Sequence, residues 1–254
     1  MVDKSSTYEG LRELALFAGA GGGILGGKLL GWRTVCAVEY EPYAASVLVA
    51  RQNDGILDPF PIWDDVRTFD GRPWRNIVDV VSGGFPCQDI SVAGKGAGIG
   101  GARSGMWSEM FRIVCEIQPR ITYIENSPAL TLRGLDRVLC DLASVGLNAR
   151  WGVVSAANTG AAHLRERIWI VAYSDSDGLQ GWPDTGSSSK SWEGPGKRVS
   201  GFLPPSAWVD KAISGGFRKP DGVAGWVDRL RAIGNGQVPA VAATAWKILM
   251  EIEP

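Results

Sequence analysis

The amino-acid sequence predicts an α/β protein whose mostly parallel β-sheet is covered by helices on both faces. Continuous apolar runs alternate with segments of helical periodicity along most of the chain. Strands that are buried on both faces lack alternating polar residues, and parallel strands need helical crossovers between them. With 254 residues, the chain can bury the core of one such domain and carry a small additional region.

Four strand–helix pairs are expected in the first part of the chain. The strands are the runs at 13–18, 34–39, 77–83 and 121–126, and the helices that follow them span 24–31, 41–53, 104–118 and 130–146. Two further runs, 151–158 and 167–174, have no helix between them and predict an antiparallel edge pair. Helical spacing returns after Pro239, where a last helix is expected.

The composition changes after residue 174. Residues 175–225 are rich in Gly, Ser, Pro and Trp and lose helical periodicity. A stretch of this length without regular structure is uncommon in a compact domain unless it is functional or disordered. We therefore expect a main domain over 1–174, a small irregular region over 175–225, and a C-terminal helical segment over 226–254 that returns to the main domain.

Charge and cysteine content exclude several classes of protein. The 26 basic and 27 acidic residues nearly cancel, so bulk charge gives no support for nucleic-acid binding. The four cysteines show no CxxC spacing and there is a single histidine, so neither a disulfide framework nor a metal site is expected. No apolar run approaches the roughly 20 residues of a membrane span. We expect a reduced, cytoplasmic monomer without membrane contact or an obligate protein partner.

A glycine turn joins the first strand to the first helix. Gly19, Gly21 and Gly23 are placed where backbone amides can approach a ligand closely. Glu39 ends the next strand 18 residues after Gly21, near the spacing at which an acid accepts hydrogen bonds from ribose hydroxyls. This pair predicts a cofactor that contains adenosine. With Gly26 the turn also fits the GxGxxG pattern, so a nicotinamide-dependent oxidoreductase stays open, as does a purely structural turn with Glu39 in solvent.

Cys87 differs from the other cysteines in its surroundings. It follows the run at 77–83, so in a parallel sheet it lies at the carboxyl end of a strand, where open α/β sheets place their ligand crevices. Pro86 stiffens the turn before it, and polar residues follow it: Gln88, Asp89 and Ser91. The remaining three lie among apolar residues and are expected to be small buried hydrophobes: Cys36, Cys115 and Cys140.

Polar residues from other strands are expected near Cys87. Glu125 ends the strand at 121–126, and it is either a proton donor beside the thiol or a strand-end acid in water. Arg165 and Arg167 alternate, so they share one face at the start of a strand. They would position a phosphate or a pyrimidine carbonyl, or form an ordinary polar edge. The glycine-rich run at 94–105 has the composition of a mobile lid.

The ordered set FAGAGGG, VEYEPYA, DDV, GGFPCQDIS, ENSPAL, RERIWIV and GNGQVP resembles the cytosine-C5 DNA methyltransferases, especially their short phage-type members. The match spans roughly 14–174 and 226–252. The resemblance implies a Rossmann-like methyltransferase fold, S-adenosylmethionine as cofactor and double-stranded DNA as substrate. The resemblance also implies which residues act in catalysis and which bind the cofactor, and Gly23 is added to the second set from the glycine turn. The catalytic set is Cys87, Glu125, Arg165 and Arg167, and the cofactor set is Phe17, Gly19, Gly21, Gly23, Glu39, Tyr40, Asp65 and Pro86.

The chemistry of cytosine agrees with these roles. C5 of cytosine becomes nucleophilic when a thiolate adds at C6 while N3 is protonated, and Cys87 and Glu125 suit those two tasks. The base must leave the duplex to be reached. We expect DNA contacts from Gln88 and Ser91 beside the thiol and from Lys197 and Arg198 in the 175–225 region, where basic residues outnumber acids.

Two departures from the family pattern stand out. Only about fifty residues occupy the place of a long target-recognition domain, and His163 stands where glutamine is usual. The short recognition region keeps a second alternative open, a catalytically silent DNA-binding relative, although the catalytic set is intact.

Overall fold

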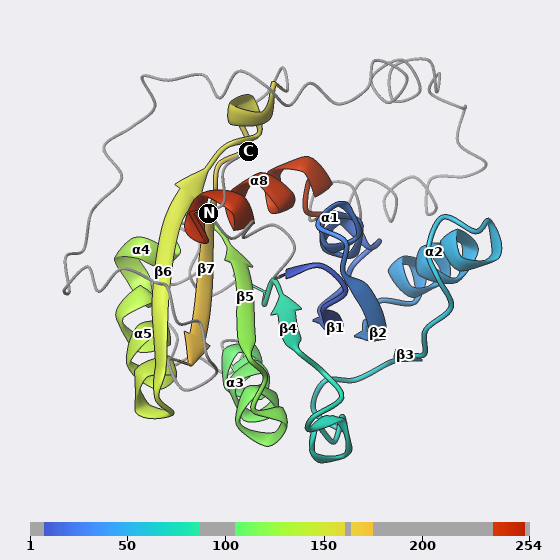
Figure 1. Ribbon diagram of the computed structural model, residues 1–254, viewed down its shortest axis with the longest axis horizontal. Helices are drawn as coiled ribbons and strands as arrows, with labels where there is room; N and C mark the ends of the chain where they lie inside the picture. Colours follow the sequence, from blue (N-terminus) through green and yellow to red (C-terminus); the bar gives the residue numbers. More distant parts are fainter. Residues whose placement is uncertain (1–7, 87–104, 161–163, 175–235, 252–254) are drawn as a thin grey trace.

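The computed structural model describes residues 8–86, 105–160, 164–174 and 236–251, and its centre is a seven-stranded sheet in the order β3-β2-β1-β4-β5-β7-β6 (Figure 1). The first five strands along the chain are mutually parallel, and β7 lies antiparallel between β5 and β6. The mostly parallel sheet and its antiparallel edge pair are therefore confirmed. The strands are β1 (Arg12–Leu16), β2 (Arg33–Val38), β3 (Ile62–Trp63), β4 (Val80–Gly83), β5 (Ile121–Asn126), β6 (Leu147–Val154) and β7 (Arg167–Ser174).

Helices cover both faces of the sheet, as expected. Along β1, Leu14 and Leu16 join the apolar core under α3 and α5, whereas Ala15 packs with residues of α1 and α2 on the other face. The last helix, α8, lies on this second face. The helices are α1 (Gly22–Leu29), α2 (Pro42–Asn53), α3 (Gly105–Ile117), α4 (Leu130–Arg133), α5 (Leu135–Ser144) and α8 (Pro239–Leu249), with 3-10 turns η2 (Arg72–Trp74) and η4 (Ala156–Thr159).

Several local features differ from what the sequence predicted. The helix expected at 130–146 is divided into α4 and α5 at Gly134, whose φ of 156° lies outside the helical range. No apolar run in the sequence predicted the two-residue strand β3. Cys140 is exposed, because α5 turns Leu135, Val138 and Leu142 toward the core and Cys140 falls on the opposite side.

An aromatic cluster and one hydrogen bond hold α8 against the sheet. Trp246 is fully buried, and its ring lies 4.6 Å from that of Trp32 and 5.3 Å from that of Tyr123, both in edge-on contact. The Tyr123 hydroxyl donates to the carbonyl of Ala242 at 2.7 Å. A Cβ added to Gly26 would lie 2.7 Å from the Cβ of Ala242, so α1 and α8 pack with their backbones close together. Two helices from opposite ends of the chain thus form one layer (Figure 1).

A carboxyl is buried within the sheet. Glu13 on β1 is 1% exposed, and it accepts hydrogen bonds from Thr34 Oγ1 at 2.7 Å and Ser82 Oγ at 2.6 Å. Burial raises its pKa to about 7, since desolvation penalises the charged form and the two hydroxyls offset only part of that penalty.

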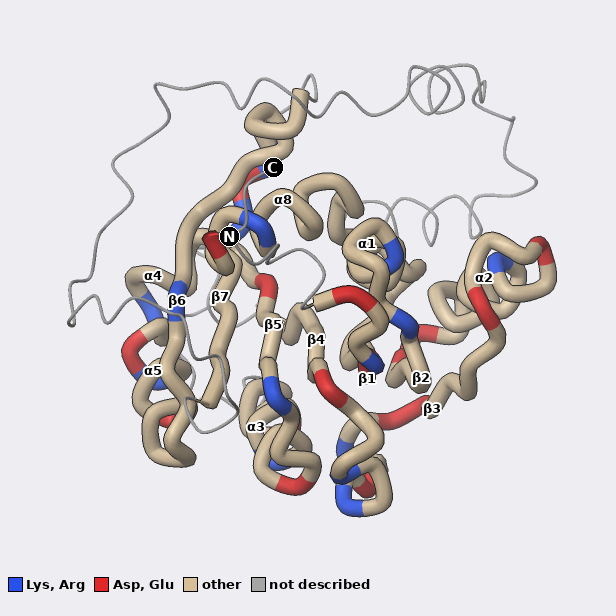
Figure 2. The backbone as a smooth tube through the Cα atoms, in the orientation of Figure 1, with Lys and Arg blue, Asp and Glu red and all other residues tan. Residues whose placement is uncertain are grey.

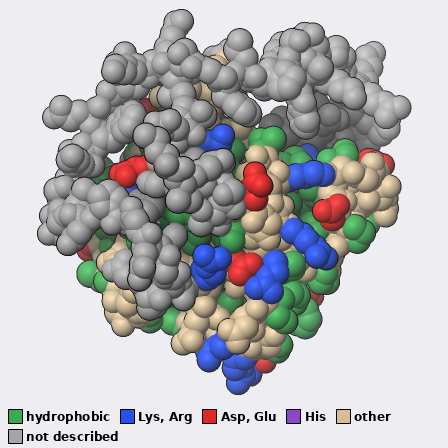
Figure 3. Space-filling model, viewed as in Figure 1, with side chains coloured by type: hydrophobic (Ala, Val, Ile, Leu, Met, Phe, Trp, Pro, Cys, Tyr) green, Lys and Arg blue, Asp and Glu red, His purple; other side chains and the backbone are tan. Residues whose placement is uncertain are grey.

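Charged residues of both signs are interspersed along the described elements, as Figure 2 shows, and both signs lie side by side on the face drawn in Figure 3. Several form ion pairs at or near the surface, among them the partly buried pair of Arg12 with Asp79 and the exposed pair of Arg72 with Asp70, each at 2.8 Å. Pairs of this kind contribute little to stability. Within the described ranges, no helix combines the length and apolarity needed to cross a membrane.

Candidate functional site

The turn after β1 is built from left-handed backbone. Phe17, Gly19 and Gly21 have φ of 52°, 54° and 86°, and Gly21 is the N-cap of α1. Only glycine adopts this conformation at little cost, and Phe17 adopts it as a strained exception. A Cβ at Gly83 would lie 2.8 Å from the carbonyl oxygen of Leu16, so the ends of β1 and β4 meet closely. The turn therefore exposes backbone at the carboxyl edge of the sheet.

The remaining glycines of the turn are required by a different neighbour. A Cβ on Gly22 would clash with the carbonyl oxygen of Gln237, and one on Gly23 would lie 2.5 Å from its side-chain Oε1. Gly26 faces Ala242 in the same way. Of the three glycines in the GxGxxG spacing that left a nicotinamide cofactor open, Gly23 and Gly26 are thus explained by the packing of α1 against Gln237 and α8. Gly21 is explained by its left-handed backbone.

Glu39 lies beside the turn, at the end of β2. Its Oε2 accepts the backbone N–H of Gly19 at 2.6 Å, and its Oε1 accepts that of Glu41 at 2.8 Å. Burial raises the pKa of Glu39, and the two N–H donors work against that shift. The acid is therefore not a solvated strand end: it braces the glycine turn while each carboxylate oxygen keeps lone-pair capacity for a further donor.

Tyr40 and Asp65 lie next along this edge. The side chain of Tyr40 is 71% exposed, which leaves a ring face open to solvent. The Arg67 guanidinium lies 6.0 Å from the centre of that ring and 2.7 Å from Asp65 Oδ2. Its hydrogen bonds hold the pKa of Asp65 below the ordinary value. Sequence reasoning missed Arg67, which ties these two expected cofactor residues together.

Glu125 is buried at the end of β5. Arg167 Nε lies 2.8 Å from Glu125 Oε1, and a Cβ on Gly84 would lie 2.5 Å from Oε2. Burial raises the pKa of Glu125, whereas the charges of Arg167 and Arg165 and a hydrogen bond from the Gln237 side chain lower it. The alternative of a strand-end acid in water is wrong. A carboxyl whose pKa is raised by burial is suited to proton transfer near neutral pH.

The two arginines have different partners. Arg167 pairs with Glu125, and Arg165 donates through Nη2 to the backbone carbonyl of Gly236. Arg165 also has a left-handed backbone, with φ of 32°. Arg165 therefore ties the start of β7 to the segment that leads into α8.

Asn126 connects β5 to the turn that follows β4. Its Nδ2 donates to the carbonyl of Phe85 at 3.1 Å, and Phe85 is buried while Pro86 is exposed. Pro86 is the last residue described before the next gap. The other expected site residues lie outside the described residues: Cys87, Gln88, Ser91, His163, Lys197 and Arg198. Among the described cysteines, burial raises the pKa of Cys36 to about 11, so that thiol is a poor nucleophile at neutral pH.

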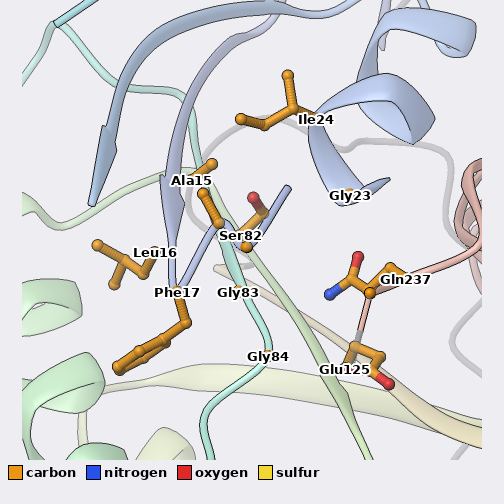
Figure 4. Close-up of a pocket in the computed structure, with 13 residues that line it drawn as sticks. Ala15, Leu16, Phe17, Gly23, Ile24, Ser82, Gly83, Gly84, Glu125 and Gln237 are labelled. Carbon is orange, nitrogen blue, oxygen red and sulfur yellow. The ribbon is translucent and has the colours of Figure 1, made fainter. Parts of the chain in front are cut away.

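The glycine turn and Glu125 open into one cleft (Figure 4). The space that it offers to a water-sized molecule is about 50 Å³. The ends of β1, β4 and β5 and the beginning of α1 line it, together with Gly236 and Gln237. Gln237 was not assigned a role from the sequence, although it lies in the GNGQVP stretch that carried part of the family resemblance.

Comparison with known proteins agrees with this geometry. The family model of C-5 cytosine-specific DNA methylases matches residues 11–198. The chain is 35% identical over 186 residues to the Type II methyltransferase M.Eco47II of Escherichia coli, which covers 68% of this chain and 42% of that protein. It is 31% identical over 185 residues to M.NgoMIV of Neisseria gonorrhoeae, covering 69% of this chain and 56% of the relative. The chain thus spans about half the length of the curated relatives it matches.

Solved structures show the same fold. The DNMT2 structure from Spodoptera frugiperda superposes with a TM-score of 0.55 at 17% identity, over 70% of this chain and 53% of that one. The Dnmt2 methyltransferase of S. pombe superposes with a TM-score of 0.53 at 20% identity, over 71% of this chain and 57% of that one. The motifs, the sheet, the shared cleft and the family match lead to one conclusion: the chain belongs to the C-5 cytosine-specific DNA methylases.

Proposed function

We propose that this protein is a DNA (cytosine-5-)-methyltransferase that uses S-adenosylmethionine. The observation that carries the proposal is the shared cleft: the glycine turn braced by Glu39 and the buried acid Glu125 open into the same space. A cofactor on one side and a base on the other would meet there. The family match and the names of the relatives support the same reaction on DNA.

The described residues fit an adenosine-containing cofactor. Glu39 would accept hydrogen bonds from ribose hydroxyls, and the open ring of Tyr40 would stack on adenine. The left-handed turn at Gly19 and Gly21 would let the ligand approach the backbone. When bound, the sulfonium of S-adenosylmethionine supplies the methyl group.

The chain's own residues would prepare the cytosine. The Cys87 thiolate forms a bond to C6 of a flipped-out base while Glu125, protonated, gives its proton to N3, so that electron density moves to C5. After C5 has gained a methyl group, it loses its proton to a base and the Cys87–C6 bond breaks, which restores the thiolate. N3 then returns its proton to the Glu125 carboxylate, so that the acid is also restored. Arg167 would keep the Glu125 carboxyl in place during these proton transfers.

Choice of DNA sequence is proposed to lie in residues 175–225. Between residues 186 and 219 there are six basic residues and two acids, whereas the whole chain is nearly neutral. Phosphate contacts need such local positive charge, and base-edge contacts need donors and acceptors on a surface that follows the groove. Relatives named Type II methyltransferases are consistent with methylation of a defined site.

The direct test is covalent trapping. DNA that contains 5-fluorocytosine should form a stable adduct with the wild-type protein, because fluorine cannot leave C5 as the proton does. Cys87→Ala should form no adduct and transfer no methyl group, while its affinity for S-adenosylhomocysteine stays close to that of the wild type. Peptide mapping of the adduct to another cysteine, or a Cys87→Ala variant that still methylates, would remove Cys87 from this role.

The recognition region has its own test. Lys197→Ala combined with Arg198→Ala should weaken DNA binding and make it less dependent on salt, because fewer counterions are released from the phosphates. Affinity is measured at several salt concentrations. An unchanged salt slope would mean that these two side chains do not contact phosphate.

A further inference from the structure

Gln237 occupies the junction between the two halves of the cleft. It precedes α8 by two residues, and its side chain lies between Gly23 of the turn and Glu125 of β5 (Figure 4). Its amide nitrogen is near Gly84, where an added Cβ would lie 3.2 Å from it and 2.5 Å from Glu125 Oε2. The Gln237 side chain donates a hydrogen bond to the Glu125 carboxylate.

The other end of the amide faces the cofactor turn. Gln237 Oε1 lies so close to Gly23 that an added Cβ there would be 2.5 Å away, and the Gln237 carbonyl lies against Gly22. One side chain therefore contacts both the first turn of α1 and the buried acid. Its backbone position is also supported, because Arg165 donates to the carbonyl of the preceding residue, Gly236.

We propose that Gln237 is a positioning residue for methyl transfer: it fixes the Glu125 carboxyl for its task at the base and links that carboxyl to the turn that holds the cofactor. This inference rests on the proposed function. Two contacts hold the Glu125 carboxyl in place. Arg167 contacts Oε1, and Gln237, a neutral donor, contacts the carboxyl from the side of the glycine turn. Loss of Gln237 leaves the carboxyl held from one side only.

The arrangement has a consequence for the pH dependence of the reaction. Glu125 is surrounded by Arg167 and Arg165 from the β7 side, by Tyr123 on its own strand and by Gln237. A hydrogen bond donated to a carboxylate favours its charged form, so removing the Gln237 donor raises the pKa of Glu125 further. Because the protonated acid is the active form, the alkaline limb of the rate profile should move to higher pH.

The test compares single-turnover methylation rates across pH for the wild type, Gln237→Met and Gln237→Glu. Gln237→Met keeps the size of the side chain but removes the donor, and we expect a rate roughly 10- to 100-fold lower, the loss typical of one hydrogen bond to a charged group. The alkaline limb of its rate profile should lie at higher pH than that of the wild type. Gln237→Glu adds a negative charge beside Glu125 and should move the limb further in the same direction.

A second variant reaches Gln237 from the other side. Gly23→Ala has a permitted backbone conformation, but its methyl group would force the Gln237 amide to move. It should therefore show the same shift of the alkaline limb as Gln237→Met. The matched control is Gln52→Met, which loses one hydrogen bond, from the Phe60 N–H, in a different part of the molecule. Its rate profile should coincide with that of the wild type.

The possible outcomes separate the two proposals. A wild type that does not methylate cytosine overturns the proposed function. A wild type that methylates, together with folded Gln237 variants whose rates fall without any movement of the limb, overturns the positioning role and assigns Gln237 a structural one. Folding is checked by thermal unfolding and by S-adenosylhomocysteine binding. A limb that moves in Gln237→Met, Gln237→Glu and Gly23→Ala, and not in Gln52→Met, supports the inference.

Discussion

Glu39 and Glu125 both end parallel strands at the same edge of the sheet, yet their partners give them different tasks. Glu39 accepts two backbone N–H groups and keeps the glycine turn in shape. Glu125 is buried against an arginine and an amide, and burial raises its pKa. In the proposed reaction, partners rather than residue type would therefore separate an acid that holds the cofactor from an acid that transfers protons.

This division can be measured. Glu125→Gln should lower the single-turnover rate by roughly 10²–10⁴-fold, the range of general acid–base groups, with little change in cofactor affinity. Glu39→Ala should weaken cofactor binding, because it removes the proposed ribose acceptor and the brace on Gly19, and should affect the rate at saturating cofactor less. Cofactor titration and single-turnover kinetics report both effects. If the two variants share one binding defect, the assignment is wrong.

Glu13 gives a prediction about stability. Its pKa is about 7 in the folded protein and about 4.5 when unfolded, so between these pH values the folded state binds more protons. The free energy of unfolding should therefore fall as pH rises from about 4.5 to about 7. Glu13→Gln keeps the shape and cannot ionise, so its stability relative to the wild type should increase by at most roughly 3 kcal/mol between pH 5 and pH 8.

Urea unfolding of both proteins at pH 5 and pH 8 measures this difference. Other titrating groups, Glu125 among them, are common to the two proteins and cancel in the comparison. An equal stability difference at both pH values would show that Glu13 titrates as an ordinary exposed acid.

At the scale of elements, the contact between α1 and α8 sets the geometry of the cleft. Tyr123 and Glu125 are two residues apart on β5 and so share one face. Tyr123 donates to α8 at Ala242, and the residues before α8 then bring Gln237 to Glu125. Strand β5 therefore both anchors α8 and carries Glu125, the acid that the segment before α8 contacts.

Gly26→Ala tests that contact. Alanine is normally better than glycine in a helix by up to about 1 kcal/mol, but here its methyl group would meet the Ala242 Cβ at 2.7 Å and the Pro239 carbonyl at 3.1 Å. Overpacking of this kind costs roughly 1–3 kcal/mol, so a net loss of stability is expected. Gly105→Ala, where an added Cβ meets nothing within 4 Å, should cost nothing.

Chemical denaturation of the two variants decides the matter. Ala242→Gly added to Gly26→Ala should recover part of the loss, since it removes the opposing methyl group. A Gly26→Ala protein as stable as the wild type would mean that α1 and α8 can separate without cost.

At the scale of the whole molecule, sequence patterns predicted the features that depend on residues close together in the chain. The apolar runs predicted β1, β2, β4, β5 and the antiparallel pair, because strands buried on both faces need continuous apolar sequence. The spacing from Gly21 placed Glu39 beside the turn. The break at Gly134 escaped prediction, since an isolated glycine within a helical pattern is often tolerated.

What depends on distant residues could not be predicted in this way. The sequence assigned Gly23 and Gly26 to ligand-binding patterns, whereas their close neighbours, Gln237 and Ala242, lie more than two hundred residues later in the chain. The contact of Gln237 with Glu125 and the burial of Glu13 under two hydroxyls likewise depend on how strands are ordered in space. No periodicity in a single segment carries that information.

The packing of α1 against α8 also affects how the chain folds during its synthesis. Residues 22–29 leave the ribosome early, and residues 239–249 follow only after more than two hundred further residues. At the usual rates of about 5–20 residues per second, the nascent chain waits on the order of ten seconds or more with Trp32 uncovered and Gly22 without its neighbour. During that interval Glu125 also lacks Gln237. A chain that has emerged only to residue 236 can hold most of its sheet, but Gln237 and α8 are still missing from its cleft. The proposed methylation would therefore begin only after residue 249 has emerged.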